Sequence, residues 1–146
     1  MDDDNLSILL DNQICFALWL ASKTLTQAYQ PLLKPLAVTY PQYLVLLVLW
    51  EGDGLTVKTL GERLHLDSGT LSPLLKKLEA KGIVRRERTE EDERSVHIVL
   101  TAKGRTLKKK AAMIPDCLTR EVGLHKKELF TLLSGLKSFN AALASR

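Results

Sequence analysis

The stretch TVKTLGERLHLDSGTLSPLLKKLEAKG, residues 56–82, predicts two short helices joined by a tight turn. The first helix, residues 57–64, follows a threonine that can cap it. Asp67 or Ser68 can cap the second helix, and Gly82 is a typical C-terminal stop. In the second helix, leucines at three- and four-residue spacing form one apolar face: Leu71, Leu74, Leu75 and Leu78. This order of elements is typical of a helix-turn-helix.

The hydrophobic period changes directly after this helix pair. Residues 83–88 and 95–100 are short β-prone runs, and the polar residues 89–94 between them predict a hairpin. A helix-turn-helix followed by a hairpin is the arrangement of a winged helix-turn-helix. We therefore expect a fold that is mainly α with a small β wing (α+β).

Two helices are predicted before the helix-turn-helix. Residues 8–29 carry apolar side chains at helical spacing, and Pro31 and Pro35 are expected to end this first helix. Residues 42–50 are apolar on every side, as a buried central helix is, and Thr39 can cap it.

Two further helices are predicted after the hairpin. One spans residues 101–118, where Pro115 is expected to bend or break its end, and the other spans residues 126–144. The apolar faces of the first helix and of these two exceed what one small domain can bury. We therefore expect the chain to form a homodimer.

The composition excludes several classes of protein. The chain has 146 residues, of which 45% are hydrophobic and 26% charged, so it is neither disordered nor of low complexity. Its longest apolar run, residues 43–50, is shorter than the roughly 20 residues that cross a bilayer, so no membrane partner is expected. The acidic opening, residues 1–4, does not resemble a signal peptide, and we expect a cytoplasmic protein. Two cysteines in such a reducing compartment are buried thiols or redox groups rather than a structural disulfide.

The positive charge is concentrated in the middle of the chain. The net charge is +4, but residues 76–110 hold twelve basic and six acidic side chains, a net +6. A polyanion is therefore expected to dock there, and double-stranded DNA accepts one helix of a helix-turn-helix in its major groove. The alternative is a solvated basic helix with an ordinary cap.

The second helix of the pair has side chains suited to DNA. Small polar groups at its first turns can reach base edges and phosphates, namely Asp67, Ser68, Thr70 and Ser72. Basic groups on the same unit suit contacts with the phosphate backbone, namely Lys76, Lys77, Lys81, Arg85 and Arg86.

The predicted hairpin tip contains side chains that disfavour DNA binding and one that favours it. Residues 90–93 are four consecutive acids, which phosphates repel, and Arg94 follows them. Asp92 and Arg94 are two residues apart, so they share a face of an extended chain and can pair. That pair would aim Arg94 at the negative potential of the minor groove. The alternative is an exposed charged loop without a partner.

Cys15 lies among apolar neighbours in the first helix, and pattern alone favours an inert core cysteine. A redox sensor needs a stabilised thiolate, and no Lys, Arg or His lies within a helical turn of Cys15. The hydroxyl groups of Tyr29 and Tyr40 are the candidate donors. On one straight helix Tyr29 is about 21 Å from Cys15, so it can reach this thiol only from the other subunit of a dimer.

Several motifs resemble those of a known family. The segment DERSV, residues 92–96, continuing to Val99-Leu100-Thr101, is similar to the wing signature of the MarR family of bacterial transcription regulators. Longer segments resemble its organic hydroperoxide resistance branch, the OhrR regulators: NQICFAL from Asn12, TYPQYLV from Thr39, LGERL from Leu60 and LDSGTL from Leu66.

The resemblance implies a homodimeric repressor that leaves a palindromic operator when an organic hydroperoxide oxidises Cys15. It also implies that Tyr29 and Tyr40 bind this thiolate across the dimer. Trp19 stands where relatives often carry Tyr, and it is either a pocket wall or plain core. Cys117 is the candidate resolving cysteine, so the oxidised product is either an intersubunit disulfide or a mixed disulfide with a small thiol. The expected organisation is a single domain, residues 1–146, with DNA-binding residues at about 55–100 and dimerisation helices at about 7–30 and 101–146.

Two other functions fit parts of the sequence. A MarR-like repressor could respond to a small aromatic ligand in an apolar dimer cleft instead of to thiol oxidation. A thiol peroxidase could use Cys15 and Cys117, although the basic helix-turn-helix makes an enzyme the weakest interpretation. We expect no metal and no cofactor, since the three histidines share no metal-ligand spacing with the cysteines.

Overall fold

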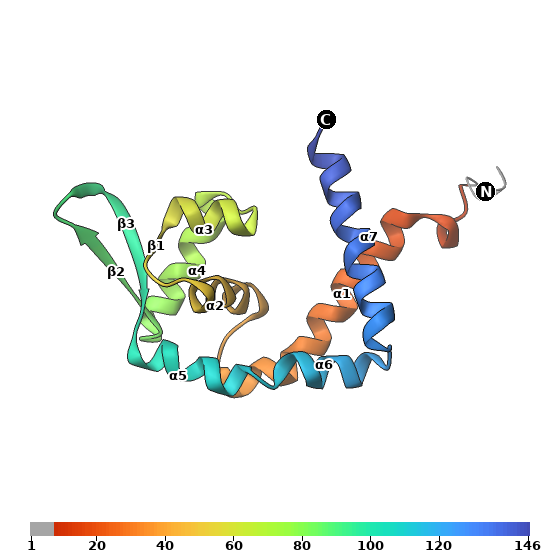
Figure 1. The fold of residues 1–146 in the computed structure, drawn as a ribbon, viewed down its shortest axis with the longest axis horizontal. Coiled ribbons are helices and arrows are strands. Elements are labelled where there is room, and N and C mark those ends of the chain that lie inside the picture. Colours follow the sequence, from red (N-terminus) through yellow and green to blue (C-terminus); the bar gives the residue numbers. More distant parts are fainter. Residues whose placement is uncertain (1–7) are drawn as a thin grey trace. The chain divides into compact units, whose positions relative to one another are not determined.

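The computed structural model describes residues 8–146, except for the side chain of Asp92 (Figure 1). The acidic opening at residues 1–4 lies outside this range. Two compact units form, one ending at Ala111 and one spanning Ala112–Arg146, and each is described by itself.

The first unit contains most of the elements. Its helices are the 3₁₀ helices η2 (Leu10–Asn12) and η3 (Lys34–Leu36) and the α-helices α1 (Ile14–Leu33), α2 (Tyr40–Glu51), α3 (Val57–Leu64), α4 (Ser68–Ala80) and α5 (Ala102–Ala111). Its strands are β1 (Leu55–Thr56), β2 (Val84–Thr89) and β3 (Asp92–Leu100). The second unit contains α6 (Ile114–Val122) and α7 (Lys126–Ala144).

The winged helix-turn-helix prediction is confirmed. Helices α3 and α4 form the helix pair, and β2 and β3 form the hairpin that extends beyond them in Figure 1. Within the described residues, an antiparallel sheet has the strand order β1-β3-β2, and Ile98 of β3 lies between Leu55 of β1 and Arg86 of β2. Strand β1 was not predicted, because two residues are too few to show a periodic pattern.

Each helix of the pair has a side chain that caps its N-terminus, as the sequence predicts. The Thr56 hydroxyl accepts a hydrogen bond from the Thr59 backbone N–H at 3.1 Å and caps α3. A carboxylate oxygen of Asp67 accepts from the Thr70 N–H at 2.8 Å, so Asp67, not Ser68, caps α4. The turn between the helices is tight, because a Cβ on Gly61 would lie 2.7 Å from the Leu66 carbonyl oxygen.

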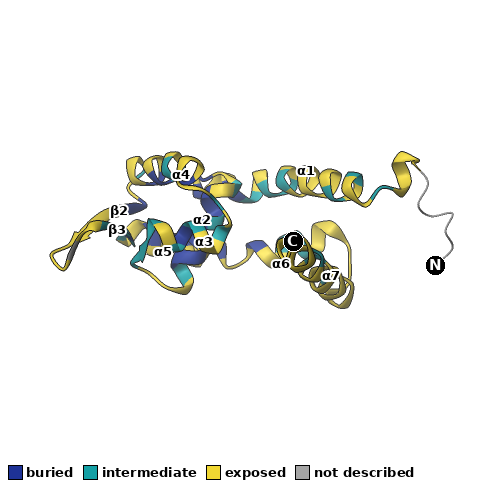
Figure 2. Ribbon diagram, turned by 90° about the horizontal axis from the view of Figure 1, so that it is seen from above, coloured by how far each residue is buried: buried dark blue, intermediate teal, exposed yellow. Residues whose placement is uncertain are grey.

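Helix α2 lies at the centre of the first unit's core. Its Val45 and Leu46 are fully buried, as are Leu60 of α3, Leu71 of α4 and Ile98 of β3. Figure 2 shows buried residues concentrated on these elements. Burial explains most of the apolar side chains of residues 43–50, although Leu47 is exposed, since fully burying one such side chain contributes about 1.5–3 kcal/mol.

The first predicted helix differs from the observed one at both ends. It begins at Ile14, after η2, and it continues through Pro31 to Leu33. The prediction that Pro31 ends the helix is wrong, because a proline near the last turn removes only one backbone donor. The chain turns instead at η3, where Ala37 adopts a left-handed φ of 54°.

The prediction of one helix over residues 101–118 is also wrong. Helix α5 ends at Ala111, and α6 starts at Ile114 with Pro115 in its first turn. A proline suits that position because the N–H groups of the first turn have no partner within the helix. Pro115 therefore marks the start of a new helix and not a bend at the end of the preceding one. Helix α7, by contrast, has the predicted bounds.

Both units leave large apolar side chains exposed in the single chain. The first unit exposes Ile14, Trp19, Leu20 and Leu25 of α1, and the second exposes Phe130, Leu132, Leu133 and Leu143 of α7. No single helix among the described residues is long and apolar enough to cross a membrane, and only the pair Ile14–Leu36 and Tyr40–Glu51, bent by 67°, meets that test.

Because Gly104 of α5 has no side chain, the backbone of Ile83, just before β2, can pack closely against α5. A Cβ at this position would lie 2.3 Å from the Ile83 carbonyl oxygen and 3.0 Å from a Leu100 methyl carbon. The Gly104 carbonyl also accepts the Trp50 indole N–H at 3.0 Å, so the helix is held in place. We therefore expect Gly104→Ala to lower the free energy of unfolding by about 1–3 kcal/mol, as overpacking does, measured by urea denaturation.

Gly52→Ala is the matched control, because no atom lies within 4 Å of a Cβ at Gly52. Its midpoint should stay close to that of the wild type, since open surface positions usually change stability by no more than about 0.5 kcal/mol. Equal midpoints for the two variants would show that Gly104 is not required for this packing.

Candidate nucleic-acid interface and thiol sites

The first turn of α4 presents the polar side chains that the sequence singled out. Asp67, Ser68 and Thr70 are exposed, and Ser72 is half-buried. The hydrogen bond from the Thr70 backbone N–H, supplemented by the Thr70 side chain, keeps the pKa of the Asp67 carboxyl below its usual value. Asp67 is therefore ionised and occupied in capping, so it orients the turn that presents its neighbours.

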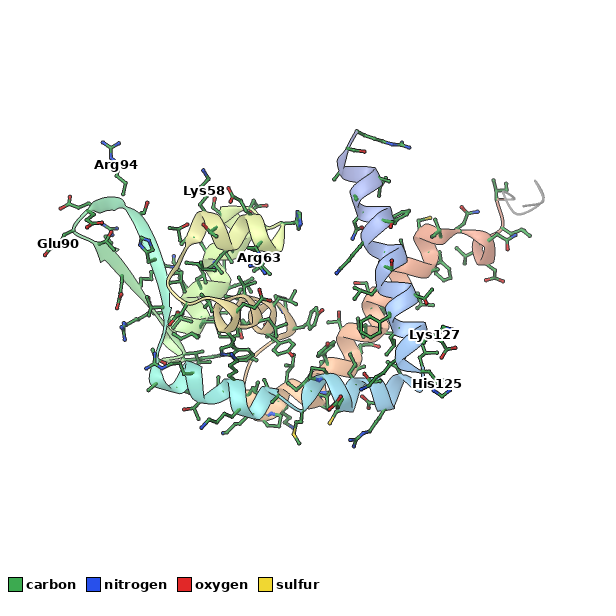
Figure 3. The ribbon with its side chains drawn as sticks, in the orientation of Figure 1. Lys58, Arg63, Glu90, Arg94, His125 and Lys127 are labelled. Carbon is green, nitrogen blue, oxygen red and sulfur yellow. The ribbon has the colours of Figure 1, made fainter. Side chains whose placement is uncertain are left out.

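A groove of about 770 Å³ runs beside this turn. It is lined by Lys58 and Glu62 of α3, by His65 directly after α3, and by Asp67 and Ser68 at the start of α4. Sequence analysis missed Lys58 and His65 as residues of this face. Helical spacing gave no signal for this pair, because His65 follows the last residue of α3 and has a left-handed φ of 54°. Lys58 projects from α3 in Figure 3.

The basic residues around α4 form two groups. Lys76 and Lys77 are exposed on the helix. Lys81 does not belong with them, because its ammonium group donates to the Ala37 carbonyl oxygen at 2.6 Å and to Gln42 Oε1 at 3.1 Å. The Lys81 ammonium is thus bound within the chain, and its contact with the DNA backbone stays a prediction.

Arg85 and Arg86 of β2 are paired within the chain. Arg85 Nε lies 2.6 Å from a Glu87 carboxylate oxygen, and Arg86 Nε lies 3.7 Å from a Glu79 carboxylate oxygen. All four side chains are exposed enough for solvent to screen the pairs, and such pairs contribute about 0–1 kcal/mol. A phosphate can therefore replace either carboxylate at little cost.

The wing tip places Arg94 in an exposed position. The side chain of Arg94 projects from β3 beyond the helix pair in Figure 3. A register shift between Arg88 and Thr89 lies on the opposite strand. The expected pairing of Arg94 with Asp92 involves a side chain that lies outside the described part of the chain.

Cys15 is the second residue of α1, and its side chain is exposed in the single chain. It is therefore not a core cysteine of the protomer. Trp19, one turn further on, is also exposed, with its ring stacked at 6.1 Å on Phe16. The Lys23 ammonium lies 5.3 Å from the centroid of the Trp19 ring, a cation–π contact on the same helix.

Tyr29 and Tyr40 lie together where α1 ends and α2 begins. Their ring centroids are 4.7 Å apart, and Tyr43 lies 5.8 Å from Tyr29. Burial, with a smaller contribution from the neighbouring phenols, raises the pKa of Tyr29 to about 12. At neutral pH these phenols are thus neutral hydroxyl donors. Tyr43, the third member, was missed because sequence analysis assigned it to the apolar core.

Continuous helix separates Cys15 from this tyrosine cluster. Both Cys15 and Tyr29 belong to α1, fourteen residues apart, which is about 21 Å along the helix axis. Cys117 is half-buried in α6 of the second unit. Within residues 8–146 no three His, Cys, Asp or Glu side chains are grouped so that they could hold a metal ion.

The fold and the polar face of α4 define a winged-helix regulator. A family described as transcriptional regulator SarA/Rot matches residues 27–111. The organic hydroperoxide resistance transcriptional regulator of Bacillus subtilis (strain 168) is 51% identical over 138 residues, covering 90% of this chain and 94% of that protein. The regulator TtmR of Methylorubrum extorquens (strain PA1) is 52% identical, covering 94% of this chain and 70% of its own.

Solved structures agree with these relatives. The structure of reduced AbfR bound to DNA superimposes with a TM-score of 0.78 at 36% identity, covering 92% of this chain and 94% of that one. A structure of disulfide-formed AbfR superimposes with a TM-score of 0.65 at 40% identity, covering 87% and 91%. The chain belongs to the OhrR branch of the MarR family of transcriptional regulators, as the motifs predicted.

The tyrosine cluster predicts a specific alkaline titration. Because the pKa of Tyr29 is raised from 10.0 to about 12, the folded protein retains this proton after the unfolded chain has lost it. The resulting stability is complete below pH 10 and is lost as the pH rises towards 12. Tyrosinate absorbance should show a component titrating near pH 12 that Tyr29→Phe removes. If the wild type titrates entirely near pH 10, the burial of Tyr29 is refuted.

Proposed function

We propose that the protein is a dimeric repressor that binds a palindromic operator and leaves it when an organic hydroperoxide oxidises Cys15. One observation carries the proposal. Cys15 is exposed, and half-buried Tyr29, which lies beside Tyr40, is about 21 Å away along the same helix. Tyr29 and Tyr40 can therefore complete a thiol site only around the Cys15 of a second copy.

The chemistry follows from this arrangement. The Cys15 thiolate attacks the outer oxygen of the hydroperoxide, the O–O bond breaks, and the alkoxide leaves and takes a proton to become an alcohol. The cysteine becomes a sulfenic acid, having lost two electrons to the peroxide. Hydrogen bonds from neutral Tyr hydroxyls to an ionised sulfur are stronger than those to a neutral one, so oxidation weakens them. Trp19, exposed one turn away, is suited to wall the pocket for the apolar part of the peroxide.

A second cysteine offers a resolution step. The thiolate of Cys117 from the partner chain attacks the sulfenic sulfur, a disulfide forms, and hydroxide leaves as water after taking a proton. A small thiol can perform the same step and give a mixed disulfide. Cys117 is half-buried in the single chain. The relative AbfR has been solved in a disulfide form, which supports a disulfide as the oxidised product.

The dimer forms through the helices that are left apolar in the single chain. α1 and α7 each expose several large hydrophobic side chains. A second copy is the occupant that covers both, because a two-fold dimer uses the same surface twice. The dimer also sets the spacing of the two α4 helices, which must be about 34 Å to enter successive major grooves.

In the complex the DNA-facing side chains divide into three roles. The polar groups of the first turns of α4 contact base edges and phosphates, with Asp67 as the cap that orients Ser68, Thr70 and Ser72. Lys76, Lys77 and Arg86 neutralise phosphates. Arg94 enters the minor groove, positioned by Asp92. The DNA-bound structure of AbfR supports this use of the fold.

A second candidate function rests on a pocket in the first unit. This pocket of about 400 Å³ is lined by Leu33, Val38 and Pro41 together with Tyr40, Lys34 and Lys81. Its apolar walls and two ammonium groups fit a small aromatic acid. In that case the repressor would respond to a ligand and would ignore the oxidation of Cys15.

The redox switch is tested by operator release. Fluorescence anisotropy on a labelled palindromic operator should show that organic hydroperoxide releases the wild type but not Cys15→Ser, because serine cannot form a sulfenic acid. Cys117→Ser should still be released at first but should form no intersubunit disulfide on a non-reducing gel. Tight binding that ignores peroxide in the wild type would exclude the sensor and favour the small-ligand regulator.

Mixed dimers test the trans arrangement within the same experiment. A Tyr29→Phe, Tyr40→Phe double variant should oxidise slowly as a homodimer, because its thiolates lack their donors. Mixing it with Cys15→Ser gives a dimer in which the remaining thiol faces intact tyrosines, and oxidation should recover. Slow oxidation in the mixed dimer would contradict donation across the interface.

The wing predicts a distinct effect on DNA affinity. Arg94→Ala should weaken operator binding by about 1–3 kcal/mol and reduce the salt dependence of binding by roughly one released ion, since one cationic contact is lost. Lys127→Ala in α7 removes the same charge far along the chain and should leave both quantities nearly unchanged. Equal affinities for wild type and Arg94→Ala would exclude the wing contact.

A further inference from the structure

Lys81 connects the end of α4 to the start of α2. It is the C-cap residue of α4, and its ammonium group donates to the Ala37 carbonyl oxygen at 2.6 Å and to Gln42 Oε1 at 3.1 Å. Both acceptors lie at the junction between η3 and the first turn of α2. The residue that caps the C-terminus of α4 is therefore attached to a segment some forty residues earlier in the chain.

The acceptors of Lys81 are themselves firmly held. Gln42 is buried, with 1% of its surface exposed, and its Oε1 also accepts the backbone N–H of Thr39 at 3.0 Å. Ala37 has a φ of 54°, a conformation that a non-glycine residue keeps only where its surroundings hold it. A buried amide oxygen shared by two donors leaves little freedom to this junction, and a lost partner there is costly.

Tyr40 is part of the same junction. It is the first residue of α2, and it lies between Thr39 and Gln42, the two residues joined by the capping hydrogen bond. Its ring is 4.7 Å from that of Tyr29. A displacement of Tyr40 therefore moves the first turn of α2, and with it the atoms to which Lys81 is bound.

We propose that Lys81 is a positioning residue that transmits the state of the tyrosine pair to the DNA-reading helix α4. This inference rests on the proposed function in one respect, that Tyr40 responds to the oxidation of Cys15. While the hydroxyl groups bind a thiolate, the first turn of α2 holds Lys81 and α4 in the DNA-binding position. When those hydrogen bonds weaken, the junction shifts and carries the C-terminal end of α4 with it.

A double-mutant cycle on operator affinity tests the coupling without peroxide. Tyr40→Ala disturbs one end of the connection, and Lys81→Met removes its two hydrogen bonds while keeping the aliphatic stem. We expect Tyr40→Ala to weaken operator binding when Lys81 is present, and this factor to shrink at least about twofold in the Lys81→Met background, as for residues that are energetically coupled. Lys81→Arg, which can still donate, should restore the full factor.

A charge-matched control separates coupling from electrostatics. Lys77→Met removes the same charge from α4 without touching Ala37 or Gln42, so its effect should add to that of Tyr40→Ala. Additive effects for Lys81→Met, or no effect of Tyr40→Ala on operator affinity, would overturn the proposal. If Lys81→Met does not fold by circular dichroism, Lys81→Gln takes its place in the same cycle, because its shorter side chain keeps a polar end but lacks the reach.

Peroxide provides the second readout. In the wild type, oxidation should weaken operator binding by a factor within the range of about 5- to 150-fold that is usual for allosteric coupling. In Lys81→Met this factor should fall towards one, although mass spectrometry shows Cys15 oxidised at the wild-type rate. An unchanged factor would contradict the role of Lys81. If the wild type itself ignores peroxide, the proposed redox function fails, while the double-mutant cycle still decides the role of Lys81.

Discussion

The length of helix α1 is the constraint on which the proposed thiol site depends. Helix α1 spans 20 residues, with Cys15 at its second position and Tyr29 near its other end. An α-helix rises about 1.5 Å per residue, so no side-chain rotation closes the gap of fourteen residues. In the proposed function a single chain therefore holds two half-sites, and a complete thiol site requires two chains.

Local sequence signals predicted elements best where one side chain decides the outcome. Thr56 and Asp67 cap the helices that they were expected to cap, and α7 has its predicted bounds. The predictions based on two prolines were wrong, because the effect of a proline on a helix depends on the turn that it occupies. Pro31 lies near the end of a helix, where losing one donor is tolerated, and Pro115 lies in a first turn, where the donor has no partner anyway. Strand β1 owes its existence to pairing with β3, which no local pattern encodes.

Only part of the candidate site could be predicted from the sequence. Cys15, Tyr29 and Tyr40 could be chosen from residue chemistry, and the structure brings the two tyrosines together. Lys81 could not be assigned, because a lysine at the end of a basic helix looks like any phosphate contact until its partners are known. Its acceptors, Ala37 and Gln42, lie about forty residues away in the chain and depend on tertiary packing. Long-range polar contacts of this kind leave no periodic trace in a sequence.

A neutral hydrogen-bond donor and a cation beside a cysteine would respond differently to the oxidation of its sulfur. A lysine or arginine beside the sulfur would stabilise the thiolate strongly, but it would also hold any later anionic product in place. A phenol whose pKa is raised to about 12 by burial remains a hydroxyl throughout, so its hydrogen bond depends on the charge of the sulfur alone. Converting thiolate to sulfenic acid therefore removes much of the interaction at once. A ligand can shift a conformational equilibrium only by its difference in affinity for the two states, and in the proposed function the charge of one sulfur atom supplies that difference.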